Sequence, residues 1–286
     1  MDDVMAISHL GRGAARTHMH GDWRPPAEWL GSPHFVVALQ DEGRAASLRE
    51  KLFSRQKRLA ACLAATPDPP PAAWVRVAVV ADGQDERLLL GEMLARVSAS
   101  LRETAVTQLA WLVQRGWPTA CLPDLGFERI NEIETYVTKS LDAPPHSPPP
   151  DLLIRAAEPQ DFPTLEALEA EAFAPLWRLS QETLAQAQRE AIWFTVAEWN
   201  GRLVGYQLSS SGSEGAHLVR LTIAPQAQGQ GVGRALLADA FRAYRRFGLR
   251  SASLNTQVDN VISQRLYLKF GFHATGERLP VWCKYL

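Results

Sequence analysis

The fold of the C-terminal half is decided by one stretch, Leu218-Val-Arg-Leu-Thr-Ile-Ala-Pro-Gln-Ala-Gln-Gly-Gln-Gly-Val-Gly-Arg-Ala-Leu-Leu237. An apolar strand stops at Pro225, three closely spaced glycines follow, and a helix begins at once. Glycine lets the backbone approach a ligand closely and adopt left-handed dihedral angles. A helix start presents free N–H groups and the positive end of the helix dipole. The stretch therefore predicts a binding site for a pyrophosphate.

Two common nucleotide-binding loops do not fit this stretch. A Walker loop ends in Gly-Lys-Ser/Thr, whereas here Gly233 is followed by Arg234 and Ala235. A dinucleotide fingerprint has the spacing G-x-G-x-x-G, whereas Gly229, Gly231 and Gly233 follow G-x-G-x-G and lie late in the domain. An ordinary glycine-rich turn without a ligand is the simpler alternative, and the apolar strand before the loop argues against it.

Two motifs in this half resemble the signatures of the GNAT acetyltransferase superfamily. The loop Gln228-x-x-Gly231-x-Gly233 is similar to the Q/R-x-x-G-x-G/A acyl-CoA loop of that family. The second motif, Asn260-x-x-Ser263-x-x-Leu266-Tyr267-x-x-x-Gly271-Phe272, resembles N-x-x-A-x-x-L-Y-x-x-x-G-F, with serine in place of the usual alanine. The resemblance covers the whole second half and implies an N-acetyltransferase that uses acetyl-CoA as the acyl donor, without a metal.

The resemblance also implies which residues hold the coenzyme. The backbone of the strand before the loop would pair with the pantetheine arm, and the loop amides would hold the pyrophosphate. The cofactor-binding residues expected on this basis are Leu221, Thr222, Ile223, Gln228, Gly229, Gln230, Gly231, Val232, Gly233, Arg234 and Asn260.

Two residues are expected to act in catalysis. Tyr267 occupies the position of the family's general acid, and a phenol of pKa about 10 can supply a proton or hydrogen bond to a thiolate of pKa about 8.5. His217 stands where many members carry a glutamate base, and an imidazole can accept the ammonium proton. Glu198 and Glu214 are alternatives, and the proton can also leave to solvent. Both residues could instead be structural, with Tyr267 packing on the sheet and His217 bonding at a strand start.

A proline-rich segment is predicted to connect two domains. The segment 143–150 carries five prolines, which favour an extended connector, and it would divide a domain of residues 1–142 from one of residues 151–286. The halves also resemble each other at an offset of about 144 residues, since residues 75–79 and residues 219–223 match. We therefore expect an α+β fold of two tandem GNAT folds, each a mixed, mostly antiparallel twisted sheet flanked by helices.

The N-terminal half lacks the features of the loop. At the matching offset, Asp85, Arg87 and Leu89 replace the three glycines, and Asp85 with Glu86 would repel a pyrophosphate. We expect a GNAT-like fold that has lost coenzyme binding. The segment Gly43–Gln56 has no counterpart in the other half and is predicted to be a charged helical insertion.

The composition limits the choice of partners and compartment. The formal net charge is −1, so no general electrostatic case for nucleic acid or a membrane surface arises. Three widely spaced cysteines fit a reducing cytoplasm better than a disulfide framework. The start Met1-Asp2-Asp3 is not followed by an apolar run, so we expect no signal peptide, and without a run of about 18 apolar residues we expect no membrane span. We expect a cytoplasmic monomer or homodimer.

The leading functional hypothesis is transfer of an acetyl group from acetyl-CoA to a primary amine of a small molecule. Acetylation of a protein or peptide N-terminus is the alternative among enzymes, and a non-catalytic acyl-CoA-binding module is the alternative of another class. Four tryptophans could line the acceptor cleft, although tryptophans on strands more often belong to the core. These are Trp177, Trp193, Trp199 and Trp282.

Overall fold

The chain forms two compact units in a computed structural model that describes residues 14–21, 29, 31–40, 58–67, 69–212 and 215–286. Unit 1 comprises Met1–Ile130 and Val281–Leu286, and unit 2 comprises Asn131–Pro280. The predicted insertion Gly43–Gln56 lies outside the described residues.

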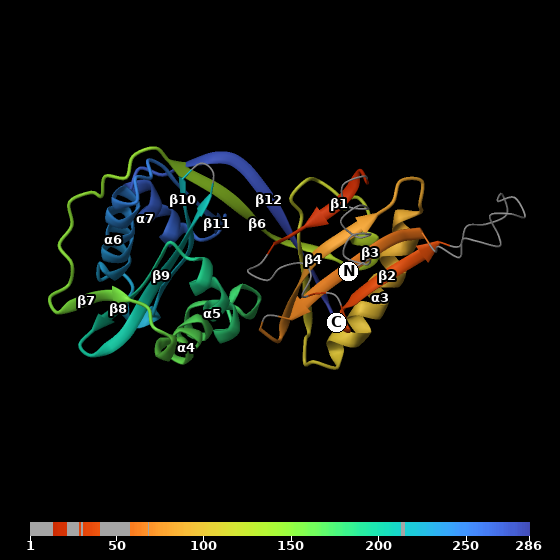
Figure 1. Cartoon of the computed structure of the whole chain (residues 1–286), viewed down its shortest axis with the longest axis horizontal. Helices are drawn as coiled ribbons and strands as arrows, with labels where there is room; N and C mark the ends of the chain where they lie inside the picture. Colours follow the sequence, from red (N-terminus) through yellow and green to blue (C-terminus); the bar gives the residue numbers. More distant parts are fainter. Residues whose placement is uncertain (1–13, 22–28, 30, 41–57, 68, 213–214) are drawn as a thin grey trace, which may run out of the picture. The chain divides into compact units, whose positions relative to one another are not determined.

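Unit 1 is a mixed sheet covered by one long helix (Figure 1). Its elements are β1 (Arg16–Met19), β2 (Phe35–Gln40), β3 (Arg58–Pro67), β4 (Ala72–Val80), α3 (Glu86–Arg102), β5 (Gln108–Leu112) and the short helix η2 (Pro123–Leu125). Strands β2, β3 and β4 are antiparallel, whereas β4 and β5 are parallel, and α3 supplies the long crossover connection that a parallel pair requires. Helix α3 buries Leu90, Leu94 and Val97 in the core of this unit.

Unit 2 repeats this order of strands and adds helices on the second face of its sheet. Its elements are β6 (Glu128–Thr138), β7 (Leu152–Ala156), η3 (Pro159–Asp161), α4 (Phe162–Ala172), η4 (Pro175–Trp177), α5 (Gln181–Glu190), β8 (Trp193–Trp199), β9 (Arg202–Gly212), β10 (Gly215–Ile223), η5 (Pro225–Ala227), α6 (Val232–Arg246), β11 (Ala252–Gln257), α7 (Val261–Lys269) and β12 (His273–Tyr285). Strands β7 to β10 are antiparallel neighbours, and β10 pairs with β11 in parallel. The predicted fold class is confirmed.

Strand β10 contributes to both faces of the sheet in unit 2. Leu218 and Leu221 pack in the apolar cluster formed with α6. Arg220 and Thr222 point to the opposite face, where both bond to Glu169 on α4. Side chains alternate from Arg220 to Thr222 because successive residues of a strand face opposite sides, and the irregularity between Leu218 and Arg220 places Leu218 on the same face as Leu221.

The division of the chain differs from the predicted one. The compact units part at residue 130, not at the proline-rich segment 143–150. Strand β6 belongs with unit 2, because residues 133–138 pair with β11. The proline-rich segment therefore lies inside unit 2, where the Trp199 indole N–H donates to Pro150 O at 3.0 Å and Ser147 O lies close to Gly231.

Strand β12 passes from unit 2 into unit 1. Its last residues, Val281–Tyr285, pair antiparallel with β5. Val281 and Cys283 are buried, and Trp282 packs against the core formed by α3 and its sheet. The C-terminal residues therefore belong to the N-terminal unit. Local sequence patterns do not reveal this pairing, because β5 and β12 are far apart in the sequence.

The predicted internal repeat is confirmed, with one change of register. Each unit has antiparallel strands followed by a helix and a parallel strand. An irregularity lies between Val75 and Val77 in β4 and between Leu218 and Arg220 in β10. Because these irregularities coincide, Val80 corresponds to Ile223, so the offset within this strand is one residue smaller than the sequence match suggested.

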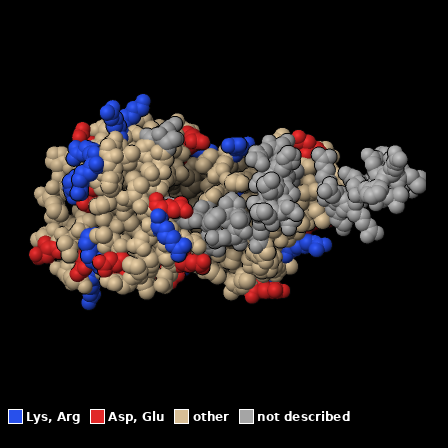
Figure 2. Space-filling model, in the orientation of Figure 1, with Lys and Arg blue, Asp and Glu red and all other residues tan. Residues whose placement is uncertain are grey.

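Charged side chains of both signs are intermingled on the visible surface, most of which is neither acidic nor basic (Figure 2). This distribution accords with the net charge of −1. No helix among the described residues has the length and apolar character needed to cross a bilayer.

Candidate functional site

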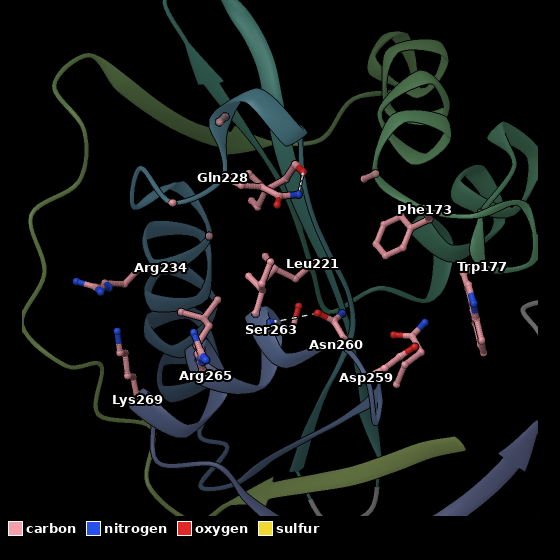
Figure 3. Close-up of a pocket in the computed structure, with 18 of the residues that line it drawn as sticks. Phe173, Trp177, Leu221, Gln228, Arg234, Asp259, Asn260, Ser263, Arg265 and Lys269 are labelled. Carbon is pink, nitrogen blue, oxygen red and sulfur yellow. Dashed lines mark hydrogen bonds between the residues drawn. The ribbon is translucent and has the colours of Figure 1, made fainter. Parts of the chain in front are cut away.

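A groove of about 660 Å³ opens in unit 2 where β10 and β11 diverge (Figure 3). The two strands pair only through Ala216–Leu218 and Ala252–Leu254. Beyond that point Leu221 and Ile223 line the groove, with Gln257 of β11 on the other side. In the described part of the chain, the edge of β10 that faces β11 therefore has no strand partner beyond Leu218, as is true of an exposed strand edge. The Ile223 carbonyl accepts from Gln228 Nε2 at 3.1 Å.

The glycine-rich loop closes one end of this groove. Gly229 and Gly231 have φ of 76° and 91°, a backbone conformation that other residues adopt only with strain. A Cβ atom at Gly233 would lie 3.5 Å from Ile223 and Leu266, an ordinary van der Waals distance, so the packing around this position leaves room for a small side chain. Gly229, Gly231 and Gly233 all line the groove, together with Gln228 and Arg234.

The backbone amides of the loop are available to a ligand. Among the described residues, the amides of Gly229, Gln230 and Gly231 form no hydrogen bond, and no side chain caps α6. The first bond of the helix runs from Ala235 N to Gly231 O at 3.0 Å, so the first-turn amides of Val232, Gly233 and Arg234 have no helical partner. Such a cluster of N–H groups at a helix start favours an anion.

Three cations lie at the loop end of the groove. Arg234 on α6 and Arg265 and Lys269 on α7 gather on one side of it (Figure 3). Arg265 and Lys269 were not expected from the sequence, because an exposed basic residue on a helix gives no local signal. The three charges add to the positive helix end and make this part of the groove suited to phosphate groups.

The opposite end of the groove combines aromatic and acidic side chains. Phe173 and Trp177, from the segment after α4, stand across the groove from the three cations (Figure 3). Asp259 lies near them, and its two carboxylate oxygens accept from Asn131 Nδ2 at 3.2 and 3.1 Å. Asp259 is the one acidic residue among the described residues that line the groove. This end of the groove therefore suits a ligand that has both an apolar part and a positively charged group.

Asn260 shapes the junction between β11 and α7. Its side chain lines the groove, and its Oδ1 caps α7 by accepting from the Ser263 amide at 3.2 Å. The carbonyl oxygen is therefore engaged, and the amide N–H₂ group is the part that can bond to a ligand.

Tyr267 lies beneath the groove wall and is not among the residues that line it. It is 6% exposed, packs against Phe272 and bonds to Ser263, whose own atoms do line the groove. Burial raises the pKa of Tyr267 to about 12, so the phenol is protonated at neutral pH.

His217 also lies outside the lining residues. It is on β10 before the strands diverge, and its Nδ1 lies 2.9 Å from the Ser253 hydroxyl. Burial lowers the pKa of His217, which keeps the imidazole neutral. Of the alternative bases, Glu198 lies on β8, 3.5 Å from Arg155, and Glu214 lies outside the described residues.

Of the four tryptophans considered for the acceptor cleft, Trp177 lines the groove. The Trp193 indole donates to Asp239 at 2.8 Å, the Trp199 indole donates to Pro150 O, and Trp282 packs in the core of unit 1. Within the described chain, the other three therefore serve the packing of their units.

A buried ionic network supports the aromatic end of the groove and was not predicted. The Glu169 carboxylate is fully buried and accepts from Tyr206 at 2.6 Å, from Thr222 at 2.7 Å and from Arg220 Nε at 3.0 Å. The Arg220 guanidinium lies 3.6 Å from the centre of the Phe173 ring and donates to Trp177 O at 2.6 Å. The Thr222 side chain thus faces away from the groove. Its backbone faces β9, because Ala224 N donates to Val204 O and alternate residues of the strand share that direction, so Leu221 and Ile223 are the residues whose backbone faces the groove.

Comparison with known proteins gives four relevant likenesses. The profile of the Acetyltransferase (GNAT) family matches residues 155–272. A mycothiol acetyltransferase of Acidothermus cellulolyticus is 30% identical over 278 residues, covering 86% of this chain and 83% of that protein. The [ribosomal protein bS18]-alanine N-acetyltransferase of Escherichia coli is 28% identical over 120 residues, 42% of this chain and 80% of that protein. A tandem GNAT protein from the clavulanic acid biosynthesis pathway has a similar fold, with a TM-score of 0.59 at 18% identity over 99% of this chain and 95% of that one.

Proposed function

Since the chain belongs to the GNAT acetyltransferase family, we propose that unit 2 binds acetyl-CoA along β10 and transfers the acetyl group to a primary amine of a small molecule. The observation that carries this proposal is the continuity between two features. The open edge of Leu221–Ile223 leads directly into the cluster of free amides from Gly229 to Arg234. In the coenzyme the pantetheine arm is likewise joined directly to the pyrophosphate, so the two parts of the ligand match the two parts of the site in order.

The chemistry divides the groove into a coenzyme end and an acceptor end. The pantetheine amides would pair with the backbone of β10 as an added strand does, and the pyrophosphate would accept from the loop amides. Arg234, Arg265 and Lys269 would contact the remaining phosphate charge. The thioester would then lie toward Phe173 and Trp177, where Asp259 would attract an ammonium group.

In the transfer step the amine nitrogen attacks the thioester carbon, a C–N bond forms and the C–S bond breaks. We propose that Tyr267 donates a hydrogen bond to the departing thiolate, directly or through Ser263. Because burial raises its pKa to about 12, full proton transfer to a thiolate of pKa about 8.5 is uphill, and stabilisation by hydrogen bonding is the larger part of its role. The amide and free CoA are the products.

The proton of the acceptor ammonium must leave before or during the attack. We propose that His217 accepts it through a water molecule, because the imidazole is kept neutral by burial. Direct release to solvent is the alternative, since His217 is bonded to Ser253 and does not line the groove. In either case the proton is not retained by the acetylated product.

Two other functions use the same groove differently. Acetylation of a protein or peptide N-terminus would place an extended chain at the end formed by Phe173 and Trp177. An acyl-CoA-binding module would hold the coenzyme without turnover. An assay of CoA release with a library of small amines and short peptides separates the three. Release with small amines supports the proposal, release with peptides alone supports the alternative enzyme, and binding without release supports the module.

A further inference from the structure

Strand β1 fills, in unit 1, the gap that forms the groove in unit 2. In unit 1 the parallel strands β4 and β5 pair only through Ala72–Trp74 and Gln108–Ala110, and then diverge. Strand β1 pairs antiparallel with β4 over Val77–Val80, directly beyond that point. By the position of the strand irregularities, these residues correspond to Arg220–Ile223 of β10.

The side chains of β1 fill the space between the diverging strands. His18 is 4% exposed, its Nε2 lies 3.2 Å from Val75 O on β4, and its ring lies 5.3 Å from the Trp111 ring on β5. The amide of His20 donates to Arg76 O at 2.7 Å and extends the pairing by one residue. Strand β1 thus makes with β4 the kind of backbone contacts that a pantetheine arm would make with β10.

The loop of unit 1 is also altered where the pyrophosphate would bind. Residues 81–84 separate β4 from the cap of α3, whereas residues 224–230 separate β10 from the cap of α6. The cap in unit 1 is Asp85, whose carboxylate accepts from the Leu88 amide at 3.1 Å. A carboxylate of the chain itself therefore occupies the anion-binding end of this helix.

The charge beside this helix start is balanced by β1. Arg16 Nε lies 2.9 Å from the Glu86 carboxylate, and Arg16 Nη1 donates to Gln84 O at 3.2 Å. The amide of Ala15 donates to the Asp82 carboxylate at 3.3 Å. Carboxylates of the chain itself therefore surround the helix start in unit 1, whereas in unit 2 the helix start presents free amides and neighbouring cations to the groove.

We infer that the groove of unit 1 is a binding site for a peptide strand, that β1 is its occupant, and that it is closed to acyl-CoA. This inference rests on the proposed function, because it takes the groove of unit 2 as the coenzyme site. Unit 1 thus has the same fold as unit 2, but β1 lies where the coenzyme would lie in unit 2.

Hydrogen–deuterium exchange of the full chain with and without saturating CoA tests the inference. We expect slower exchange at residues 221–223 and 228–234 on addition of CoA, and unchanged exchange at residues 16–20 and 77–80. Faster exchange of β1 on addition of CoA would show that the coenzyme displaces it and would overturn the inference. Unchanged exchange in both units would overturn the proposed function, and the inference of a groove closed to coenzyme would fall with it.

A peptide of residues 14–21, labelled with a fluorophore, tests the site directly. The full chain carrying His18→Pro loses the strand amide that faces β4, since His20 donates to β4 and alternate residues share that direction. We expect the peptide to bind this variant at one site and to bind the unaltered chain at least tenfold more weakly. The peptide N-methylated at His18 should fail to bind, whereas the peptide N-methylated at Thr17, whose amide faces away, should still bind.

Competition by CoA completes the test. We expect peptide fluorescence anisotropy to be unaffected by CoA at a concentration that saturates unit 2. Displacement of the peptide by CoA, equal binding to both proteins, or equal binding of both methylated peptides would overturn the inference. If the His18→Pro chain fails to fold, the exchange measurement on the unaltered chain still decides it.

Discussion

The Glu169 carboxylate on α4 and the Arg220 guanidinium on β10 form a buried ion pair behind the groove. Glu169 is fully buried, and the side chain of Arg220 is 14% exposed. The same guanidinium lies against the Phe173 ring and bonds the Trp177 carbonyl. The pair therefore links the strand that would hold the coenzyme to the aromatic wall that would hold the acceptor.

Removal of the cation from this pair should be costly. We expect Arg220→Met to lower the free energy of unfolding by about 3–5 kcal/mol, because it leaves the Glu169 charge buried without its partner. The double variant with Glu169→Gln should regain part of that loss. Urea unfolding measures both. Arg245→Met, which breaks an exposed pair with Asp142, is the control and should cost less than about 1 kcal/mol. Equal losses for the two arginines would refute the argument.

Gly231→Asp should abolish most coenzyme binding. The new carboxylate would lie at the start of α6, where the pyrophosphate is expected, and we expect at least about a hundredfold loss of acetyl-CoA affinity in calorimetry. Gly248→Asp is the matched control, because Gly248 also has positive φ, at 76°, but follows the other end of the helix. Normal affinity of the Gly231 variant would remove the loop from the coenzyme site.

Tyr267→Phe should lower turnover without weakening coenzyme binding. Loss of the hydroxyl removes the proposed hydrogen bond to the thiolate, and we expect kcat to fall about a hundredfold. Tyr244→Phe is the control, since Tyr244 is buried on α6 and bonds to Ser209 away from the groove lining. An equal effect of the two substitutions on kcat would show that Tyr267 acts through packing.

His217→Ala tests the proposed base through the pH dependence of kcat/KM. A base must be neutral to act, and burial lowers the pKa of His217, so activity should persist to a pH below the ordinary histidine range and then fall. We expect the alanine variant to lose this acid limb and about tenfold in rate. An unchanged profile would assign the proton to solvent.

Acidification should destabilise unit 1 through His18. Burial lowers the pKa of His18 to about 4, whereas in the unfolded chain it is about 6.5, so the unfolded state binds more protons between these values. Stability is therefore highest above pH 6.5 and falls by about 3 kcal/mol as the pH drops to 4. His18→Gln should show a smaller decrease in urea unfolding at matched pH values. Identical pH dependence of the two proteins would contradict the assignment.

Local signals in the sequence were sufficient for the loop and for the order of elements around it. Glycines, a proline and an apolar period define the strand, turn and helix from Leu218 to Leu237 because each depends on neighbouring residues. Glu169 gave no such signal, since a glutamate on a helix is ordinarily exposed and its partners are far away in the sequence. The boundary between the units also depends on residues far apart in the sequence. Strand β6 precedes the prolines but belongs with unit 2, because it pairs with β11.

The course of β12 imposes an order on biosynthesis. Val281–Tyr285 complete the sheet edge at β5, yet they emerge from the ribosome only after every residue of unit 2. Unit 1, although translated first, must keep that edge of β5 unpaired until unit 2 has been made. Its final closure is therefore a late event in the maturation of the polypeptide.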